Sequence, residues 1–194
     1  QLEELSAEIL NKEASILVVS GTMGNLVSVL AQTRRGDSII LEETSHMFLK
    51  EVGGVATVAG TFPRSIKGVN GFISPKQLEK AVFSPEILHP KSSLACIENS
   101  HNAAGGKSLS VEETKSFCKV AHQNSLHVHL DGARLFNAAV AQGVSAAELV
   151  ADVDSATFCL TKGLGCPVGS IVGGSREFVD EARRMRQMLG GGMR

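Results

Sequence analysis

The amino-acid sequence predicts an α/β protein with a mostly parallel sheet and flanking helices. Short apolar runs alternate with segments of helical periodicity along the 194 residues, and no period repeats. Most of the apolar runs are continuous rather than alternating, as expected of strands that are covered on both faces. The 20 glycines cluster at turns, which indicates tight strand-to-helix connections or close approach of the backbone to a ligand. The length corresponds to about one domain.

The helical segments carry start and stop signals. Residues 74–77 (Ser-Pro-Lys-Gln) and 110–113 (Ser-Val-Glu-Glu) are capping boxes, in which a Ser and a Gln or Glu side chain satisfy free backbone groups at a helix start. Gly36 closes the second segment, and residues 190–192 (Gly-Gly-Gly) stop the last one. The apolar residues of the first segment are expected on one helical face: Leu2, Leu5, Ile9 and Leu10. The expected helices are 2–13, 22–34, 74–83, 110–124, 134–142, 145–150 and 176–189.

The apolar runs predict strands at 15–19, 38–41, 55–59, 94–97, 126–130, 155–160 and 168–172, with a loop over 84–93. Polar residues follow several of these strands, namely residues 20–22 (Ser-Gly-Thr), 98–99 (Glu-Asn), Asp131 and Lys162. Open sheets of this kind bind ligands at the carboxyl ends of their strands. The sequence therefore predicts a functional site along that edge.

Composition excludes several classes of function. Hydrophobic residues make up 43% and charged residues 20%, as in soluble globular proteins. The net charge is −1, and the arginines within residues 183–186 belong to an amphipathic helix, so we expect no nucleic-acid partner. No apolar stretch reaches the roughly 18 residues of a membrane helix, so we expect no membrane partner. The four cysteines, which lack CxxC spacing, predict reduced thiols in a cytoplasmic protein: Cys96, Cys118, Cys159 and Cys166.

Lys162 and Asp131 are the strongest candidates for chemistry. Lys162 follows an apolar strand and precedes residues 163–165 (Gly-Leu-Gly), and partial burial of such a lysine lowers its pKa and favours Schiff-base formation. A solvent-facing loop lysine is the alternative. Asp131 ends the strand 126–130, where a carboxylate can pair with a protonated heterocyclic nitrogen.

A metal site is the rival interpretation of Asp131. Residues two apart share a face of a strand, so His127, His129 and Asp131 could converge on one ion, as in a metal hydrolase. However, no further histidine or acid follows nearby, and Arg134 would repel a dication. We therefore expect no metal, and a purely structural role for these polar residues also stays open.

Three weaker signals accompany these residues. Residues 21–24 (Gly-Thr-Met-Gly) lie between a strand and a helix, where free N–H groups and the helix dipole suit a phosphate. The segment lacks the GxxxxGK[ST] and GxGxxG patterns, which disfavours nucleotide binding and leaves an ordinary N-cap turn as the alternative. His46 could stack on an aromatic ring, and His101 could act as an acid or base near neutral pH. Either histidine could equally be structural.

Taken in order, these segments resemble the threonine aldolase family. The matching stretches are SGTMGN (20–25), ENSHN (98–102), DGAR (131–134), CLTKGLG (159–165), PVGS (167–170) and LGGGMR (189–194). Their order and spacing fit throughout, and together they cover essentially the whole chain. The resemblance implies the large domain of a fold-type I pyridoxal 5′-phosphate (PLP) enzyme, a low-specificity L-threonine aldolase. Such an enzyme cleaves L-threonine and L-allo-threonine to glycine and acetaldehyde.

The resemblance also implies a role for each matching residue. Lys162 would form the Schiff base with PLP, Asp131 would keep the pyridine nitrogen protonated, and His46 would stack on the ring. Arg134 would lie near the substrate carboxylate, and His101 near the substrate β-hydroxyl. The implied cofactor-binding residues are Lys162, Asp131, Arg134, His46, Gly21, Thr22 and Met23. The implied base is His46, His101 or an ordered water.

The chain departs from the family in length. It begins at Gln1 without Met, and the resemblance implies a further segment before Leu2 and a small C-terminal domain after Arg194. We therefore expect residues 1–194 to be a large domain truncated at both ends, from a protein that forms dimers or tetramers. An inactive fragment is one alternative. A β-eliminating lyase or a serine hydroxymethyltransferase-like enzyme is another, although LTKGLG and LGGGMR favour the aldolase.

Overall fold

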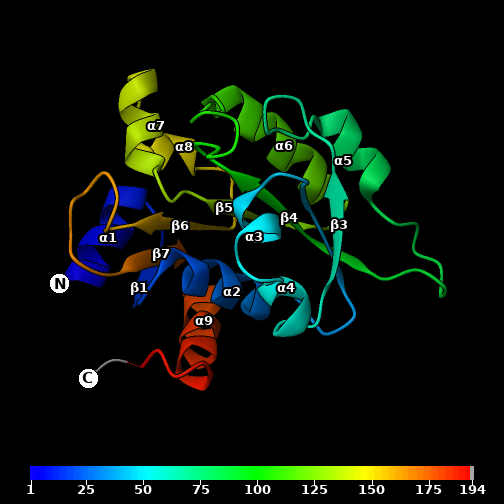
Figure 1. Ribbon diagram of the computed structural model, residues 1–194, viewed down its shortest axis with the longest axis horizontal. Helices are drawn as coiled ribbons and strands as arrows, with labels where there is room; N and C mark the ends of the chain where they lie inside the picture. The colour runs from blue at the N-terminus through cyan, green and yellow to red at the C-terminus, as the bar shows by residue number, and fades with distance from the viewer. Residues whose placement is uncertain (193–194) are drawn as a thin grey trace.

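A seven-stranded sheet forms the centre of the computed structural model, which describes residues 1–192 (Figure 1). The strands are β1 (Ala14–Val18), β2 (Ser38–Glu42), β3 (Phe62–Ile66), β4 (Ser92–Glu98), β5 (His127–Asp131), β6 (Ser155–Cys159) and β7 (Ser170–Gly174). Their order is β1-β7-β6-β5-β4-β2-β3. Strand β7 runs antiparallel to β1 and β6, and the remaining pairs are parallel. The predicted mostly parallel α/β sheet is confirmed.

Helices cover both faces of the sheet (Figure 1). They are α1 (Leu2–Leu10), α2 (Gly21–Gln32), α3 (His46–Leu49), α4 (Gly54–Thr57), α5 (Pro75–Ala81), α6 (Val111–Gln123), α7 (Leu135–Gln142), α8 (Ala146–Leu149) and α9 (Arg176–Met188). Helices α2 and α9 pack on one face through a core that includes Val27, Val172 and Val179. Helices α1 and α5 to α8 lie on the other face, over the larger core around Leu130 and Phe117.

The capping signals place the helix starts correctly. Ser74 and Ser110 both form complete capping boxes, with Gln77 and Glu113 as their partners. At the start of α2, the Ser20 hydroxyl accepts a hydrogen bond from the Met23 N–H at 3.1 Å. These local signals are confirmed because each depends on only four neighbouring residues.

The strand predicted at 55–59 is wrong. The chain forms the short helix α4 there, after Val52 and Gly53, which both have positive φ angles of 53° and 68°. A short apolar run alone cannot distinguish a strand from a buried helical turn. The strand of this region is β3, whose residues Pro63 and Arg64 interrupt the apolar pattern. An edge strand tolerates a proline because only one side of it is paired.

The predicted apolar face of the first helix is also wrong. Leu10 is 1% exposed, whereas Leu2, Leu5 and Ile9 are 44%, 52% and 42% exposed. The buried face of α1 consists of Ser6, Ala7 and Leu10, because residues three and four apart lie above one another on a helix. The other three apolar residues form an outward stripe.

Two exclusions made from the composition can be compared with the fold. Among the described residues, no helix combines the length and the apolar character needed to cross a membrane. Cys96, Cys118 and Cys159 are buried as free thiols, and Cys166 is an exposed one. Burial raises the pKa of Cys118 to about 12, so this thiol stays protonated.

Gly24→Ala is expected to destabilise the fold. A Cβ at this position would lie 2.9 Å from Thr157 Cγ2 and 3.2 Å from Val172 Cγ2, so α2 would have to move away from the sheet. We expect the free energy of unfolding to fall by roughly 1–3 kcal/mol, as in other overpacked cores. Gly54→Ala is the matched control, since its Cβ would meet only Leu26 Cδ1 at 3.9 Å. Urea denaturation gives the comparison, and equal stability of the two variants would contradict the packing argument.

Candidate functional site

Asp131 lies at the centre of a polar cluster on the carboxyl edge of the sheet. It ends β5, and its Cα is in register with Glu98 at the end of β4 and with Thr157 in β6. Its side chain is buried, with the residue only 3% exposed. The parallel register therefore brings polar residues of three neighbouring strands to one place, as the position of Asp131 after an apolar run predicted.

Two donors hold the Asp131 carboxylate. Its Oδ1 accepts a hydrogen bond from the Ala133 N–H at 3.1 Å, and its Oδ2 accepts one from Asn25 Nδ2 at 2.9 Å. The same Asn25 nitrogen donates to Glu51 Oε1 at 2.8 Å. One buried amide of α2 therefore connects two carboxylates from different segments, and it fixes Asp131 relative to the loop after α3.

His46 joins this cluster through Glu51. The His46 Nδ1 lies 3.0 Å from Glu51 Oε1, and the His46 side chain is 32% exposed while that of Glu51 is 3% exposed. Burial, together with the charge of Asp131, raises the pKa of Glu51 to about 7, against the hydrogen bonds from Asn25 and His46. The Glu51 carboxyl can therefore gain or lose a proton near neutral pH, directly behind a half-exposed imidazole.

His46, Glu51 and Asp131 offer ligand atoms within 4.8 Å of one another, as a cation site would. However, Asn25 Nδ2 donates to both carboxylates and would face any ion placed between them. An amide N–H repels a cation, so the donor set favours a hydrogen-bonded acid cluster over a metal centre.

The metal interpretation of strand β5 is not supported. His127 and Asp131 stand at opposite ends of the strand, about 13 Å apart at 3.3 Å per residue. The His127 side chain is 59% exposed, and its Nδ1 lies 3.8 Å from Asp154 Oδ1. Both ring nitrogens of His129 face other partners, Ser155 and Asn25. The three residues share a face but do not converge.

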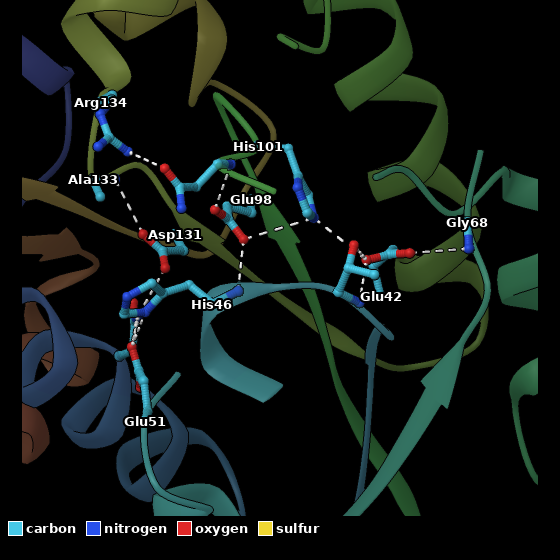
Figure 2. A network of polar contacts seen from close by, with 12 residues as sticks. Glu42, His46, Glu51, Gly68, Glu98, His101, Asp131, Ala133 and Arg134 are labelled. Carbon is cyan, nitrogen blue, oxygen red and sulfur yellow. Dashed lines mark hydrogen bonds and ion pairs between the residues drawn. The ribbon is translucent and has the colours of Figure 1, made fainter. Parts of the chain in front are cut away.

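Glu98 connects His46 to a second branch of the network (Figure 2). Its Oε2 accepts from the His46 N–H at 2.8 Å, and its Oε1 accepts from the Asn102 N–H at 2.9 Å. Asn102 Oδ1 in turn accepts from Arg134 Nη1 at 3.0 Å. The half-buried Arg134, three residues after Asp131, is therefore joined to Glu98 through Asn102, and its contact with a substrate carboxylate stays a prediction.

His101 is fully buried beside two carboxylates. Its side chain is 0% exposed, and its Nε2 lies 3.4 Å from Glu42 Oε2 and 3.7 Å from Glu98 Oε2. Gly71 covers the ring so closely that a Cβ there would come within 2.5 Å of it. Contact between His101 and a substrate hydroxyl stays a prediction, because the described chain leaves this ring no exposed surface.

Lys162 follows β6 on the same edge of the sheet as Asp131. Residues 161–168 are all exposed, Lys162 among them, so the partial burial expected for this lysine is absent from the described chain. Gly21 brings the first turn of α2 close to this point, since a Cβ there would lie 2.8 Å from Cys159 Sγ. The structure thus places Lys162 and Gly21 on the edge that carries Asp131.

The start of α2 carries three of the residues predicted to bind the cofactor, and these residues differ in their surroundings. Thr22 is exposed in the first turn, next to Gly21. The Met23 N–H is already bonded to the Ser20 hydroxyl, and the Met23 side chain packs against the core that contains Ile16. The structure therefore does not direct Met23 toward the cluster. The final motif, residues 189–194, extends to Met193 and Arg194, which lie outside the described residues.

The sequence did not identify Asn25 and Glu51 as residues of the site, and it named Glu98 only as a polar residue at a strand end, without a role. Asn25 lies at a helix start and Glu98 at a strand end, each inside a motif quoted above. Their positions in these motifs could have marked them as residues of the site. Glu51 carries no such signal. Its contact with His46 spans only five residues, but its place in the cluster depends on the hydrogen bond from Asn25, 26 residues away, which is a tertiary property.

Comparison with known proteins adds a family to this geometry. The profile of the beta-eliminating lyase family matches residues 1–194. The chain is 42% identical over 198 residues to low-specificity L-threonine aldolase 1 of Arabidopsis thaliana, covering 100% of this chain and 55% of that protein. It is 38% identical over 194 residues to the low specificity L-threonine aldolase of Escherichia coli K12, covering 100% of this chain and 57% of that protein. The chain thus spans about half the length of the curated relatives it matches.

Solved structures show the same fold. A putative L-allo-threonine aldolase from Listeria monocytogenes superposes with a TM-score of 0.85 at 25% identity, over 98% of this chain and 52% of that chain. A threonine aldolase from Leishmania major superposes with a TM-score of 0.88 at 20% identity, over 98% of this chain and 56% of that chain, and this likeness shows the fold alone.

Glu51→Gln is expected to change how folding stability depends on pH. Because the pKa of Glu51 is raised to about 7 from an ordinary 4.5, the folded chain binds the proton more tightly than the unfolded chain does. The free energy of unfolding should therefore fall as pH rises through this window, by on the order of 2–3 kcal/mol at 1.4 kcal/mol per pH unit. The Gln variant should lack this component.

Urea denaturation between pH 4.5 and 8 measures the effect, with Glu79→Gln at an exposed position as the control. Parallel stability curves for wild type and Glu51→Gln would show that Glu51 has no raised pKa.

Proposed function

Because the chain belongs to the beta-eliminating lyase family, we propose that it is the PLP-binding large domain of a low-specificity L-threonine aldolase. The whole protein would cleave L-threonine and L-allo-threonine to glycine and acetaldehyde. The observation that supports this most directly is the buried Asp131 carboxylate beside the half-exposed His46 ring, at the sheet edge that also carries Lys162. The curated relatives are about twice as long, so the activity is proposed for the whole protein.

The residues of the site fit PLP by their chemistry. Asp131 has two donors on its oxygens and is positioned as an acceptor for a protonated ring nitrogen. The N-terminus of α2 supplies N–H groups at Gly21 and Thr22, and a helix N-terminus favours a phosphate. A side chain at Gly21 would clash with Cys159 Sγ, so the glycine lets this helix start lie against the end of β6, beside the segment that carries Lys162. His46 supplies a flat ring, and Lys162 supplies an exposed amine.

Three residues of the chain would each have a separate role in binding. Lys162 would hold the cofactor through its amine, and Asp131 would hold a proton on the ring nitrogen. Arg134 would bind the substrate carboxylate. When bound, PLP supplies an electron sink for the pair released by breaking the Cα–Cβ bond.

The base that removes the β-hydroxyl proton is proposed to depend on His46 and Glu51. His46 Nδ1 faces the Glu51 carboxylate, which leaves Nε2 to accept a proton from the hydroxyl or from a water. A carboxyl group whose pKa lies at about 7 can balance the charge of the imidazole as that proton arrives. This arrangement favours His46 over the buried His101 among the predicted candidates.

Location and assembly are part of the proposal. We propose a cytoplasmic homo-oligomer, a dimer or tetramer. Exposed apolar residues support the assembly, because Leu2, Leu5 and Ile9 form a stripe on α1, and Leu164 and Val168 are 43% and 59% exposed in the loop after β6. Surfaces of this kind commonly pack against another subunit or domain.

A β-eliminating activity is the second candidate, since the matching family carries that name. The names of the relatives favour threonine as substrate. Turnover of L-threonine, L-serine and aromatic amino acids by the full-length protein separates these activities, and absence of turnover and of PLP binding by residues 1–194 alone would support an inactive fragment.

Lys162 is expected to carry the cofactor in the full-length protein. Purified protein should show a visible PLP absorbance that borohydride abolishes, and peptide mapping should find a phosphopyridoxyl adduct on Lys162. Lys162→Ala should abolish turnover and keep the fold, as judged by circular dichroism, because the exposed side chain contributes little to packing. Lys115→Ala, at an exposed position of α6, is the control. Retained threonine cleavage by Lys162→Ala would refute the assignment.

Asp131→Asn is expected to reduce kcat strongly while PLP still binds weakly. The amide cannot hold a proton on the ring nitrogen, and loss of one such electrostatic interaction costs roughly 100- to 1,000-fold in rate. Steady-state kinetics of the full-length protein measures the loss, with Asp152→Asn at an exposed position as the control. A rate within about threefold of wild type would argue against the role of Asp131.

A further inference from the structure

A line of hydrogen bonds, buried except at its half-buried start, runs through the chain to Asp131. It begins at Gln32, the last residue of α2, and passes through Ser155 and His129 to Asn25. Only its last member, the Asn25 amide, touches the two carboxylates of the site. The hydrogen bonds along this line all run in one direction, and the orientation of the Asn25 amide determines it.

The Asn25 amide has one orientation that satisfies its surroundings. Its Nδ2 lies 2.8 Å from Glu51 Oε1 and 2.9 Å from Asp131 Oδ2, and its Oδ1 lies 3.1 Å from Thr157 Oγ1. A flipped amide would direct its carbonyl oxygen at two carboxylates inside a site where the residue is only 1% exposed. Since buried carboxylates require donors, the NH₂ group must face them and the oxygen must face away.

This orientation determines the tautomer of His129. The His129 Nε2 lies 3.1 Å from Asn25 Oδ1, which can only accept, so Nε2 carries the proton and donates it. Complete burial lowers the pKa of His129 to about 4, so the ring is neutral at physiological pH. A neutral ring with its proton on Nε2 must accept at Nδ1.

The remaining partners agree with that tautomer. Ser155 Oγ lies 2.8 Å from His129 Nδ1 and can donate its hydroxyl proton there. The Ser155 oxygen then accepts from Gln32 Nε2 at 2.8 Å. Every donor along the line therefore points toward the carboxyl edge of the sheet, from Gln32 to Ser155, His129, Asn25 and finally Asp131.

We propose that His129 is a positioning residue, whose Nε2–H holds the Asn25 amide so that its two N–H groups bind Glu51 and Asp131. It acts through Asn25 and touches neither carboxylate. Without this donor the Asn25 oxygen keeps only the Thr157 hydroxyl, and the amide can rotate away from the carboxylates. This inference rests on the proposed function, because Asp131 is the residue expected to meet the PLP ring nitrogen.

The test uses the full-length protein and three variants. His129→Leu removes the donor, whereas His129→Gln keeps an N–H at about the position of Nε2 and an acceptor beside it. His127→Gln is the control, on the same strand but 59% exposed. We expect His129→Leu to weaken PLP affinity 10- to 100-fold. Removing a residue that orients a ligand-binding group has an effect of this size at metal sites. We expect His129→Gln to restore affinity to within about threefold and His127→Gln to match wild type, by titration of the visible absorbance.

A second measurement does not depend on the cofactor. Long-range ¹H–¹⁵N correlation of the histidine rings in the PLP-free protein should show His129 neutral with its proton on Nε2 between pH 5 and 8, and the Asn25 side-chain amide signals should shift in His129→Leu. A charged His129, a proton on Nδ1, or unchanged PLP affinity in a folded His129→Leu variant would overturn the inference.

If His129→Leu does not fold, two other measurements decide the matter. They are the tautomer of His129 in the wild type and the PLP affinity of Ser155→Ala, which is expected to fall severalfold. Wild-type protein that binds no PLP would refute the proposed function, while the tautomer would still decide the role of His129.

Discussion

The site depends on one buried amide between two carboxylates. Glu51 and Asp131 are 7% and 3% exposed, and each would lose much of its hydration free energy if it had no donor. Asn25 supplies one N–H to each. Burial and the charge of Asp131 nevertheless disfavour the charged form of Glu51, and they raise its pKa to about 7. In such a pair Glu51 can exchange a proton near neutral pH, while Asp131 keeps its donors Asn25 and Ala133.

Helix α2 packs close enough to the sheet for the Asn25 amide to reach Asp131. Gly24, one residue before Asn25, lies so close to β6 that a Cβ would come within 2.9 Å of Thr157, and Gly21 approaches Cys159 in the same way. Small residues at these two positions let the helix pack against the strand ends. The Asn25 side chain can then reach the Asp131 carboxylate from the helix side, while the register of β4, β5 and β6 aligns Glu98, Asp131 and Thr157 beneath it.

A second group of buried charges fixes the parts of the site that face solvent. Glu98 accepts backbone N–H groups at the start of α3 and in the loop after β4, and it thereby fixes His46 and the segment that meets Arg134 (Figure 2). The buried His101 ring lies between Glu98 and Glu42, with its Nε2 3.7 Å from Glu98 Oε2 and 3.4 Å from Glu42 Oε2. The backbone of the half-exposed His46 is therefore bonded to the buried Glu98 carboxylate.

The sequence by itself determined the fold class, most helix starts, and the edge of the sheet on which Asp131, Lys162 and the start of α2 lie, because these follow from periodicity, four-residue capping signals and strand ends. It failed at residues 55–59 and on the buried face of α1, where short apolar stretches are compatible with more than one packing. Only the tertiary structure placed Glu51 behind His46, buried His101, left Lys162 exposed, and joined His129 to Asn25 across 104 residues. These contacts join residues that are distant in the chain or brought together by a turn, and their hydrogen bonds depend on distances and burial that no local pattern encodes.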